Sequence, residues 1–212
     1  MTELELRAQM CEVGRRLYAK GLIGATEGNI SCRLSPRQIL CTPTGLCKGF
    51  MRPDDLTVID TAGNIVRGAP PSSEIKLHLG IFKGRKDCQA VIHAHPPIAT
   101  AFTVAGENIP DDILPEAAYV LGSVVTVPFA FPGTDEVPRS LEPFLEDHKT
   151  FLLSHHGAAT MGSSLFDALY RMETLERIAF MIYTARTMGT LLPMPSSAFT
   201  KLQKNVLNGN LS

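Results

Sequence analysis

The sequence predicts an α/β fold in which helices cover a sheet. Short apolar stretches typical of strands are interspersed with longer stretches whose apolar residues recur at helical spacing. The 212 residues contain no linker, repeat or low-complexity tract, so we expect a single domain over residues 1–212. With 44% apolar and 19% charged residues, the chain can bury a core of ordinary size.

Each expected element is bounded by residues that start or stop it. The first helix is expected over residues 2–20, where Thr2 and Glu5 form a capping box and Gly21 ends the helix. Strands, separated by turn residues, are expected over 30–34, 38–42, 56–59, 65–66, 90–93, 123–129 and 151–154. Later helices, the last of them a short one in the tail, are expected over 74–83, 96–104, 136–145, 165–188 and after 198.

Composition excludes several classes of partner. A formal net charge of -1 offers no basic surface, so neither nucleic acid nor an anionic membrane is an expected partner. No apolar run approaches the roughly 20 residues that cross a bilayer, and the N-terminus lacks the basic and apolar regions of a secretion signal. The five cysteines are odd in number and form no Cys-x-x-Cys pair, which favours reduced thiols in a cytoplasmic protein.

Two histidine pairs lie at the ends of predicted strands. Side chains at i and i+2 of a strand lie on the same side, so His93 and His95 can bind one ion, and imidazole suits zinc. Alone, this pair is equally well explained as two polar residues at a strand end. His155 and His156 follow the strand 151–154, and only one of them can join a shared site, because adjacent strand residues point to opposite faces. The coincidence of the two pairs favours a metal centre.

Ser72, Ser73 and Glu74 precede a predicted helix. A capping serine, with Glu74 near the positive end of the helix dipole, explains these residues without any function. Hydroxyls and amides at a helix start also bind phosphate, which would place Glu74 beside an anion site and close to the metal. His78, one turn later on the same face, is interpreted as a residue that packs the helix or that contacts a metal-binding side chain without binding the metal itself.

Two loops that contain glycine complete the candidate set. In residues 26–29 and 42–45, glycine permits close approach of the backbone to an anion, and threonine hydroxyls can donate to it. Each loop alone predicts nothing further, and neither contains the lysine of a nucleotide P-loop. Glu27 must point away from the anion for this interpretation to hold.

Taken together, these segments resemble the class II aldolase/adducin family, and within it the L-fuculose-1-phosphate aldolase type. The resemblance covers residues 5–190 and rests on the order Gly28-Asn29, Thr44-Gly45, Ser72-Ser73-Glu74, His93-x-His95 and His156-Gly157. It implies a three-layer α/β/α fold with a largely antiparallel central sheet. It also implies a homotetramer with active sites at the subunit interfaces.

The resemblance further implies roles for individual residues. His93, His95 and His156 match the ligands of Zn²⁺, with another divalent metal as the alternative. Glu74 matches the carboxylate that binds the resting metal and then acts as acid and base. Glu116 is a candidate for the group that handles the aldehyde oxygen, a role given to a tyrosine in fuculose phosphate aldolases. The phosphate-binding positions match Gly28, Asn29, Thr44, Gly45, Ser72 and Ser73.

The implied activity is that of a zinc-dependent aldehyde-lyase. It would cleave a ketose 1-phosphate, resembling fuculose 1-phosphate or a deoxypentulose or methylthioribulose phosphate, to dihydroxyacetone phosphate and a small aldehyde through an ene-diolate. Alternatives on the same scaffold are a dehydratase, an epimerase or a decarboxylase of a sugar phosphate. A non-catalytic interaction domain like the adducin head is disfavoured by the complete set of three histidines and one glutamate. A zinc hydrolase would leave the serine and threonine segments without a purpose.

Overall fold

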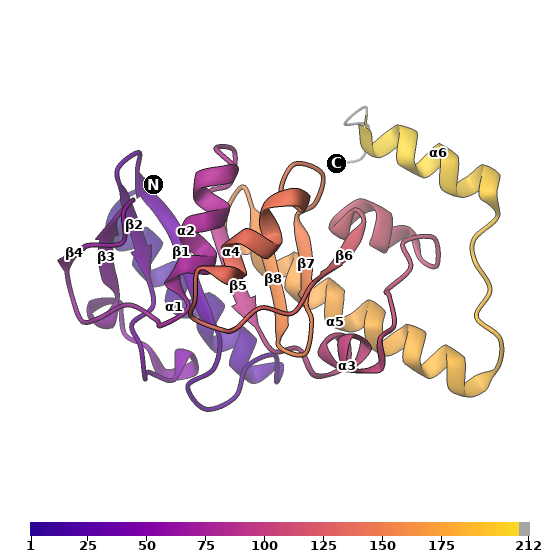
Figure 1. The fold of residues 1–212 in the computed structure, drawn as a ribbon, viewed down its shortest axis with the longest axis horizontal. Helices are drawn as coiled ribbons and strands as arrows, with labels where there is room; N and C mark the ends of the chain where they lie inside the picture. Colours follow the sequence, from indigo (N-terminus) through magenta and orange to yellow (C-terminus); the bar gives the residue numbers. More distant parts are fainter. Residues whose placement is uncertain (208–212) are drawn as a thin grey trace.

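The computed structural model describes residues 1–207 of the chain (Figure 1). Its α-helices are α1 (Glu3–Ala19), α2 (Ile75–Gly84), α3 (Pro97–Ala105), α4 (Glu136–Leu141), α5 (Leu165–Met188) and α6 (Ser196–Leu207). Its strands are β1 (Asn29–Ser35), β2 (Gln38–Cys41), β3 (Thr57–Asp60), β4 (Ile65–Arg67), β5 (Ala90–Ala94), β6 (Val124–Val127), β7 (Thr150–Leu153) and β8 (Gly157–Gly162). Shorter helical turns are η1 (Lys48–Phe50), η2 (Pro53–Asp55), the π-helical η3 (Ala117–Leu121) and η4 (Glu142–Phe144).

The strands form one sheet in the order β4-β3-β2-β1-β5-β8-β7-β6. Neighbouring strands are antiparallel, except that β6 and β7 are parallel, which confirms the largely antiparallel sheet. The sequence prediction lacks β8, whose residues Gly-Ala-Ala-Thr-Met-Gly have low intrinsic β-propensity. β8 is nevertheless buried along its whole length, because β5 and β7 pair with it on its two sides.

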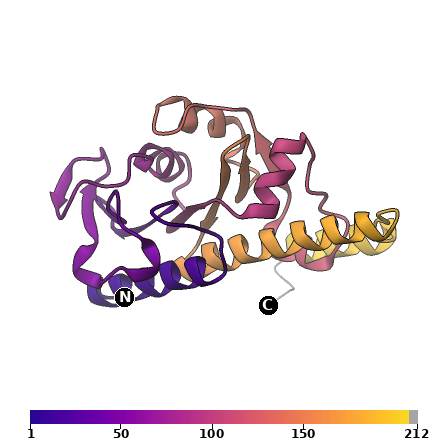
Figure 2. The ribbon, with the colours of Figure 1, turned by 90° about the horizontal axis from the view of Figure 1, so that it is seen from below.

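Helices cover both faces of the sheet, as predicted. Apolar side chains of α1, α3 and α5 pack on one face, and those of α2 and α4 pack on the other. The alternation along β5 serves both layers, since Ile92 joins the first core and Val91 the second. Figure 2 shows α1 and α5 lying along one side of the molecule, beneath the sheet.

The C-terminal helices extend beyond the sheet. The buried residues of the 24-residue helix α5 end at Ile182, whereas Phe180, Tyr183 and Met188 are exposed. Figure 1 shows α6 set apart from the sheet and joined to α5 by an extended segment. Within residues 1–207, no helix combines the length and apolarity that a membrane span requires.

Candidate active site

The candidate site lies where strand ends meet the start of α2. The register of the sheet places Asn29, at the start of β1, directly opposite His93 in β5, so their side chains share one face. This is the face that α2 covers, because His93 alternates with residues of the opposite core. His95 follows the end of β5, and His156 lies in the turn between β7 and β8. Glu74 is the N-cap residue of α2 and completes the group.

Glu74, His93, His95 and His156 form a compact cluster of metal-binding side chains. One ligand atom from each lies within 4.8 Å of the others. Nε2 of His93 is 3.1 Å from Oε2 of Glu74, and Nε2 of His156 is 3.1 Å from Oε1 of the same carboxylate. The Nε2 atoms of His93 and His95 are 3.2 Å apart. Three imidazoles and one carboxylate can hold a divalent metal ion, and zinc commonly takes such ligands.

The protonation of the imidazoles fits a metal ion. Nδ1 of His93 donates to the carbonyl oxygen of Ala158 at 2.9 Å, which leaves the lone pair of Nε2 facing the cluster. Burial, together with the neighbouring His93 and His156, lowers the pKa of His95 to about 4, so its ring is neutral at physiological pH. Neutral ring nitrogens directed at a common point are the ligands that a divalent cation requires.

The carboxylate of Glu74 is ionised in this environment. Burial acts to raise its pKa, but the ring nitrogens of His156 and His93, each 3.1 Å from a carboxylate oxygen, outweigh that effect and hold the pKa below its usual value. The Glu74 side chain forms no capping hydrogen bond with α2. Helix capping therefore does not explain this residue, whose carboxylate faces the histidines instead.

Asn29 and Ser72 support Glu74 from behind. Nδ2 of Asn29 donates to Oε2 of Glu74 at 3.2 Å and to Oγ of Ser72 at 3.1 Å. Oγ of Ser72 also accepts the backbone amide of Glu74 at 3.3 Å. Both supporting side chains are buried. Two residues predicted to bind phosphate thus contact the predicted acid/base residue directly.

The two loops with predicted phosphate-binding residues lie beside the start of α2. Pro43 and Pro71 form an isolated β-bridge, which brings the loop 42–45 against the segment that precedes Glu74. Thr44, Gly45 and Ser73 are exposed in this region. Their exposure leaves them accessible to a ligand.

Gly28 has a packing reason to be glycine. Its φ is +67°, a left-handed conformation that favours glycine. A Cβ atom there would lie 2.6 Å from Cγ2 of Ile23 and 2.9 Å from the carbonyl oxygen of His93. This close approach accounts for Gly28 whether or not an anion binds, and it keeps β1 tight against the strand that carries the ligands.

Three residues singled out in the sequence lie beside the cluster. The Glu27 carboxylate accepts the amide of Gly24 at 3.0 Å and lies 3.8 Å from Nδ1 of His95, so it turns toward its own loop and a ligand histidine. His155 is exposed, with a φ of 55°, and only His156 of that pair joins the cluster. Glu116 is exposed at the start of η3 and forms no hydrogen bond or ion pair with the cluster within the described residues.

Comparison with known proteins supplies the family. The model of the Class II Aldolase and Adducin N-terminal domain matches residues 8–183. The chain belongs to the class II aldolase and adducin family. One relative of this chain, 3-oxo-tetronate 4-phosphate decarboxylase of Haemophilus influenzae, is 32% identical to it over 87% of this chain and 90% of the relative's own length.

Two further similar proteins carry other names. Methylthioribulose-1-phosphate dehydratase of Methylococcus capsulatus is 35% identical over 82% of this chain and 92% of its own. A solved L-fuculose 1-phosphate aldolase superposes with a TM-score of 0.86 at 26% identity and covers 95% of each chain. The class II aldolase fold is therefore shown, and the similar proteins carry the names of three different lyases.

The sequence analysis did not identify Lys48, a buried lysine near Glu74. Its side chain is 2% exposed, and Nζ donates to the carbonyl oxygen of Thr26. Burial lowers its pKa, while the nearby Cys47 and Glu74 act to raise it. Lysine is almost always solvent-exposed, so its position three residues after Gly45 gave no signal of burial.

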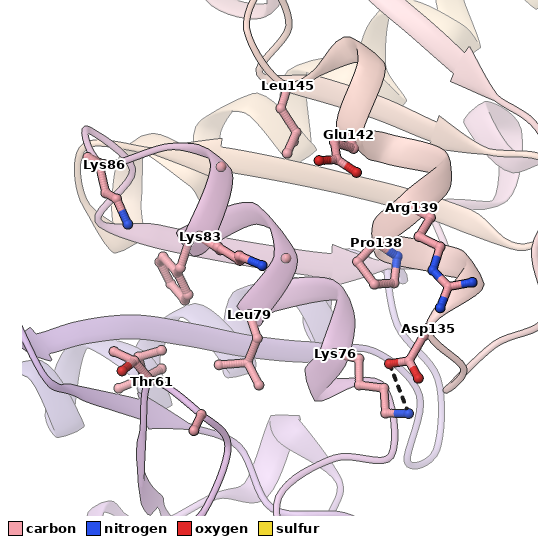
Figure 3. Close-up of a pocket in the computed structure, with 15 residues that line it drawn as sticks. Thr61, Lys76, Leu79, Lys83, Lys86, Asp135, Pro138, Arg139, Glu142 and Leu145 are labelled. Atoms are coloured by element: carbon pink, nitrogen blue, oxygen red, sulfur yellow. Dashed lines mark ion pairs between the residues drawn. The ribbon is translucent and has the colours of Figure 1, made fainter.

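A hollow of about 760 Å³ lies away from the cluster, between α2 and α4 (Figure 3). Leu79 and Pro138 line it together with Arg139, and Nζ of Lys76 pairs with Asp135 at 3.1 Å across its edge. None of the predicted site residues lines this hollow. The histidine cluster therefore remains the candidate active site.

Proposed function

We propose that this chain is a metal-dependent lyase of a small phosphorylated sugar acid, and that it decarboxylates a 3-oxo acid phosphate such as 3-oxo-tetronate 4-phosphate. The observation that carries this proposal is the cluster of three histidines around the single carboxylate of Glu74. The similarity to 3-oxo-tetronate 4-phosphate decarboxylase supports the choice of substrate. Decarboxylation is thus preferred to the aldol cleavage that the sequence alone favoured.

The proposed metal residues are His93, His95 and His156, with Glu74 as a fourth ligand in the resting state. When bound there, a divalent ion, for which we propose zinc, supplies a Lewis acid that stabilises negative charge on the substrate oxygen. With substrate bound, Glu74 would no longer serve as a ligand and would act as an acid/base group beside the substrate.

The bond changes in decarboxylation need one proton donor. In a 3-oxo acid, the bond between C1 and C2 breaks, carbon dioxide leaves, and the electron pair remains on C2 in conjugation with the C3 oxygen. Glu74 accepts one proton from solution and delivers it to C2, so each turnover consumes one proton and releases one carbon dioxide. With 3-oxo-tetronate 4-phosphate, the product is dihydroxyacetone phosphate.

Aldol cleavage of a ketose 1-phosphate is the second candidate, and the similarity to L-fuculose 1-phosphate aldolase supports it. It leaves the electron pair on the equivalent carbon, so Glu74 would protonate the same position. However, it also needs a group that removes the proton from the hydroxyl of the departing aldehyde. Within the described residues of one chain, Glu74 is the only carboxylate in the cluster, and the nearby Glu27, 3.8 Å from Nδ1 of His95, accepts the amide of Gly24 in its own loop. Glu116 is the candidate for that extra role only in an assembled protein. Decarboxylation makes no such demand, because carbon dioxide departs without losing a proton.

Phosphate recognition is proposed at the loops beside α2. The exposed Thr44, Gly45 and Ser73 offer donors in the segments next to Glu74, while Gly28, Asn29 and Ser72 are buried. A helix start with nearby hydroxyls favours a bound anion. The anchor would fix the reacting carbon relative to Glu74, which is the main benefit of a phosphate handle.

We also propose a cytoplasmic homotetramer as the working assembly. The side chains of Glu74 and His156 retain 16% and 12% exposure, and that of His95 retains 27%, so the cluster opens to the surface of a single chain. Exposed aromatic residues that a partner could cover include Phe129 and Phe131, whose rings meet edge to face with centroids 5.3 Å apart. Light scattering coupled to gel filtration would measure the mass in solution, and a monomer at micromolar concentration would contradict this assembly.

One assay separates the candidate reactions. The metal-loaded protein is incubated with 3-oxo-tetronate 4-phosphate, L-fuculose 1-phosphate or methylthioribulose 1-phosphate, and carbon dioxide, aldehyde and dihydroxyacetone phosphate are measured. Decarboxylation predicts carbon dioxide and dihydroxyacetone phosphate in equal amounts from the first substrate. Aldehyde from the second substrate, with no carbon dioxide from the first, would overturn the decarboxylase proposal in favour of the aldolase.

A further inference from the structure

His78 is a buried titratable residue to which the proposed reaction assigns no part. It lies in α2, one turn after Glu74, and its side chain is 1% exposed. Its ring is directed at β1, where Oγ of Ser31 is 2.6 Å from Nδ1 and where Oδ1 of Asn29 is bonded to Nε2. Both ring nitrogens are therefore used, and neither partner is a metal-binding residue.

The network fixes which group donates in each bond. The carboxylate of Glu74 only accepts, so the Asn29 amide must direct its NH₂ group toward Glu74 and its oxygen toward His78. Nε2 of His78 must then carry the proton. Burial lowers the pKa of His78 to about 3, so the ring is neutral, Nδ1 accepts, and the Ser31 hydroxyl donates.

The chain of donors runs in one direction, from Ser31 through His78 and Asn29 to Glu74. We infer that His78 is a positioning residue, which holds the Asn29 amide in the one orientation that donates to the acid/base carboxylate of Glu74. A flipped amide would place its oxygen against the carboxylate and leave an N–H group facing the N–H of His78. Such a mismatch in a buried site is costly, because buried polar groups must be paired.

This arrangement matters most when Glu74 leaves the metal. The carboxylate then loses its contacts with the ion, and the Asn29 amide with the neighbouring Ser72 hydroxyl remains to hold it near the reacting carbon. Removing a residue that hydrogen-bonds to a metal-binding side chain, or to its support, typically lowers metal affinity or activity by about 10–100-fold. The kinetic part of this inference rests on the proposed function, whereas its structural part does not.

The first test is independent of any substrate. Long-range ¹H–¹⁵N NMR spectra of the zinc-loaded protein report which nitrogen of each imidazole carries the proton. We expect the His78 signal to show a protonated Nε2 and an unprotonated Nδ1 at neutral pH, and to disappear in His78→Gln. A proton on Nδ1 instead, or a doubly protonated ring, would overturn the assigned network, whatever reaction the enzyme performs.

The second test separates positioning from packing. His78→Met keeps an apolar side chain of similar length in the core but removes the donor, and we expect kcat to fall about 10–100-fold. His78→Gln restores an N–H group that can reach Asn29, and we expect it to recover most of the lost kcat. Thr160→Val is the matched control. It removes a buried hydroxyl of β8, which donates to the carbonyl oxygen of Ala168 in α5 at 2.8 Å.

Melting temperatures are measured for all three variants, so that loss of stability is separated from loss of turnover. Equal kcat in His78→Met, His78→Gln and the wild type would show that the residue only packs, and the inference would be wrong. If His78→Met does not fold, the His78 tautomer measured by NMR and the kcat of His78→Gln still test whether His78 orients Asn29. If no substrate of the three classes is turned over, the proposed function fails while the NMR test of His78 remains valid.

Discussion

The two sides of the candidate site differ in how completely a single chain forms them. On the metal side, Glu74, His93, His95 and His156 place their ligand atoms within 4.8 Å of one another. On the substrate side, Thr44, Gly45, Ser73 and Glu116 are all exposed. Strand register and a tight turn fix the metal side, so one chain suffices for it. The substrate side stays open in one chain, and the proposed substrate or a second copy in the proposed tetramer would cover it.

The largest expected effect is on the metal side. Removing one imidazole from a four-ligand set leaves an incomplete site, so His156→Ala should lose both bound zinc and activity. Elemental analysis of the purified variant measures the metal. His155→Asn is the matched control, because the neighbouring side chain is exposed and asparagine tolerates its left-handed backbone. Equal zinc content in His156→Ala and the wild type would contradict the assigned cluster, and His95→Ala should behave like His156→Ala.

The second effect tests whether Glu74 links the two sides. Glu74→Gln keeps the shape of the side chain but cannot carry the proton, so kcat should fall by about 10²–10⁴-fold. Substrate binding, measured by calorimetry, should change much less, because the glutamine still fits beside Asn29 and Ser72. Normal turnover in this variant would mean that another group moves the proton.

Much of the metal side could be predicted from the sequence, because strand spacing determines which histidines share a face. The i, i+2 spacing at a strand end placed His93 and His95 on one side, and the second histidine pair then favoured a metal centre. Strand alternation predicted only that one of His155 and His156 could join the cluster, and the resemblance indicated His156, which is the one that lies there. Both lie in a turn, where the positive φ of His155 turns that side chain outward, and the alternation of a strand does not apply.

Other features depend on contacts between distant segments and gave no local signal. β8 was missed because glycine and alanine are poor strand formers, and pairing on both sides overrides their propensity. The cross-strand pairing of Asn29 with His93 is set by the register of the whole sheet. The burial of Lys48 depends on its packing between α1 and the loop that carries Thr26. The proposed reaction rests on similarity to lyases with different names, and no local pattern in the sequence chooses among them.

A third, smaller effect concerns the substrate side. Thr44→Ala removes one hydroxyl donor to the proposed phosphate, and a hydrogen bond to a charged group contributes about 1.5–3 kcal/mol. We therefore expect KM for the phosphorylated substrate to rise about 10–100-fold, with zinc content unchanged. The same variant assayed with the unphosphorylated sugar acid should show no such rise. A similar increase for both substrates would contradict the phosphate anchor.

The smallest effect is on stability, and it again distinguishes the buried side from the exposed one. Burial lowers the pKa of His78 from 6.5 to about 3, so the unfolded chain binds a proton that the folded chain does not. The stability that the neutral ring supplies is fully present above pH 6.5 and is lost as the pH falls toward 3. Between pH 7 and pH 5.5 this amounts to about 1 kcal/mol of unfolding free energy.

Urea unfolding of the chelator-treated protein at several pH values measures this loss. His78→Gln should flatten the dependence by about one proton, because glutamine does not titrate. Ser73→Ala on the exposed substrate side should leave the slope unchanged, since no buried charge depends on that hydroxyl. If His78→Gln keeps the full slope, the His78 ring is not the group that titrates. The ring would then be more exposed to solvent than its hydrogen bonds with Ser31 and Asn29 indicate.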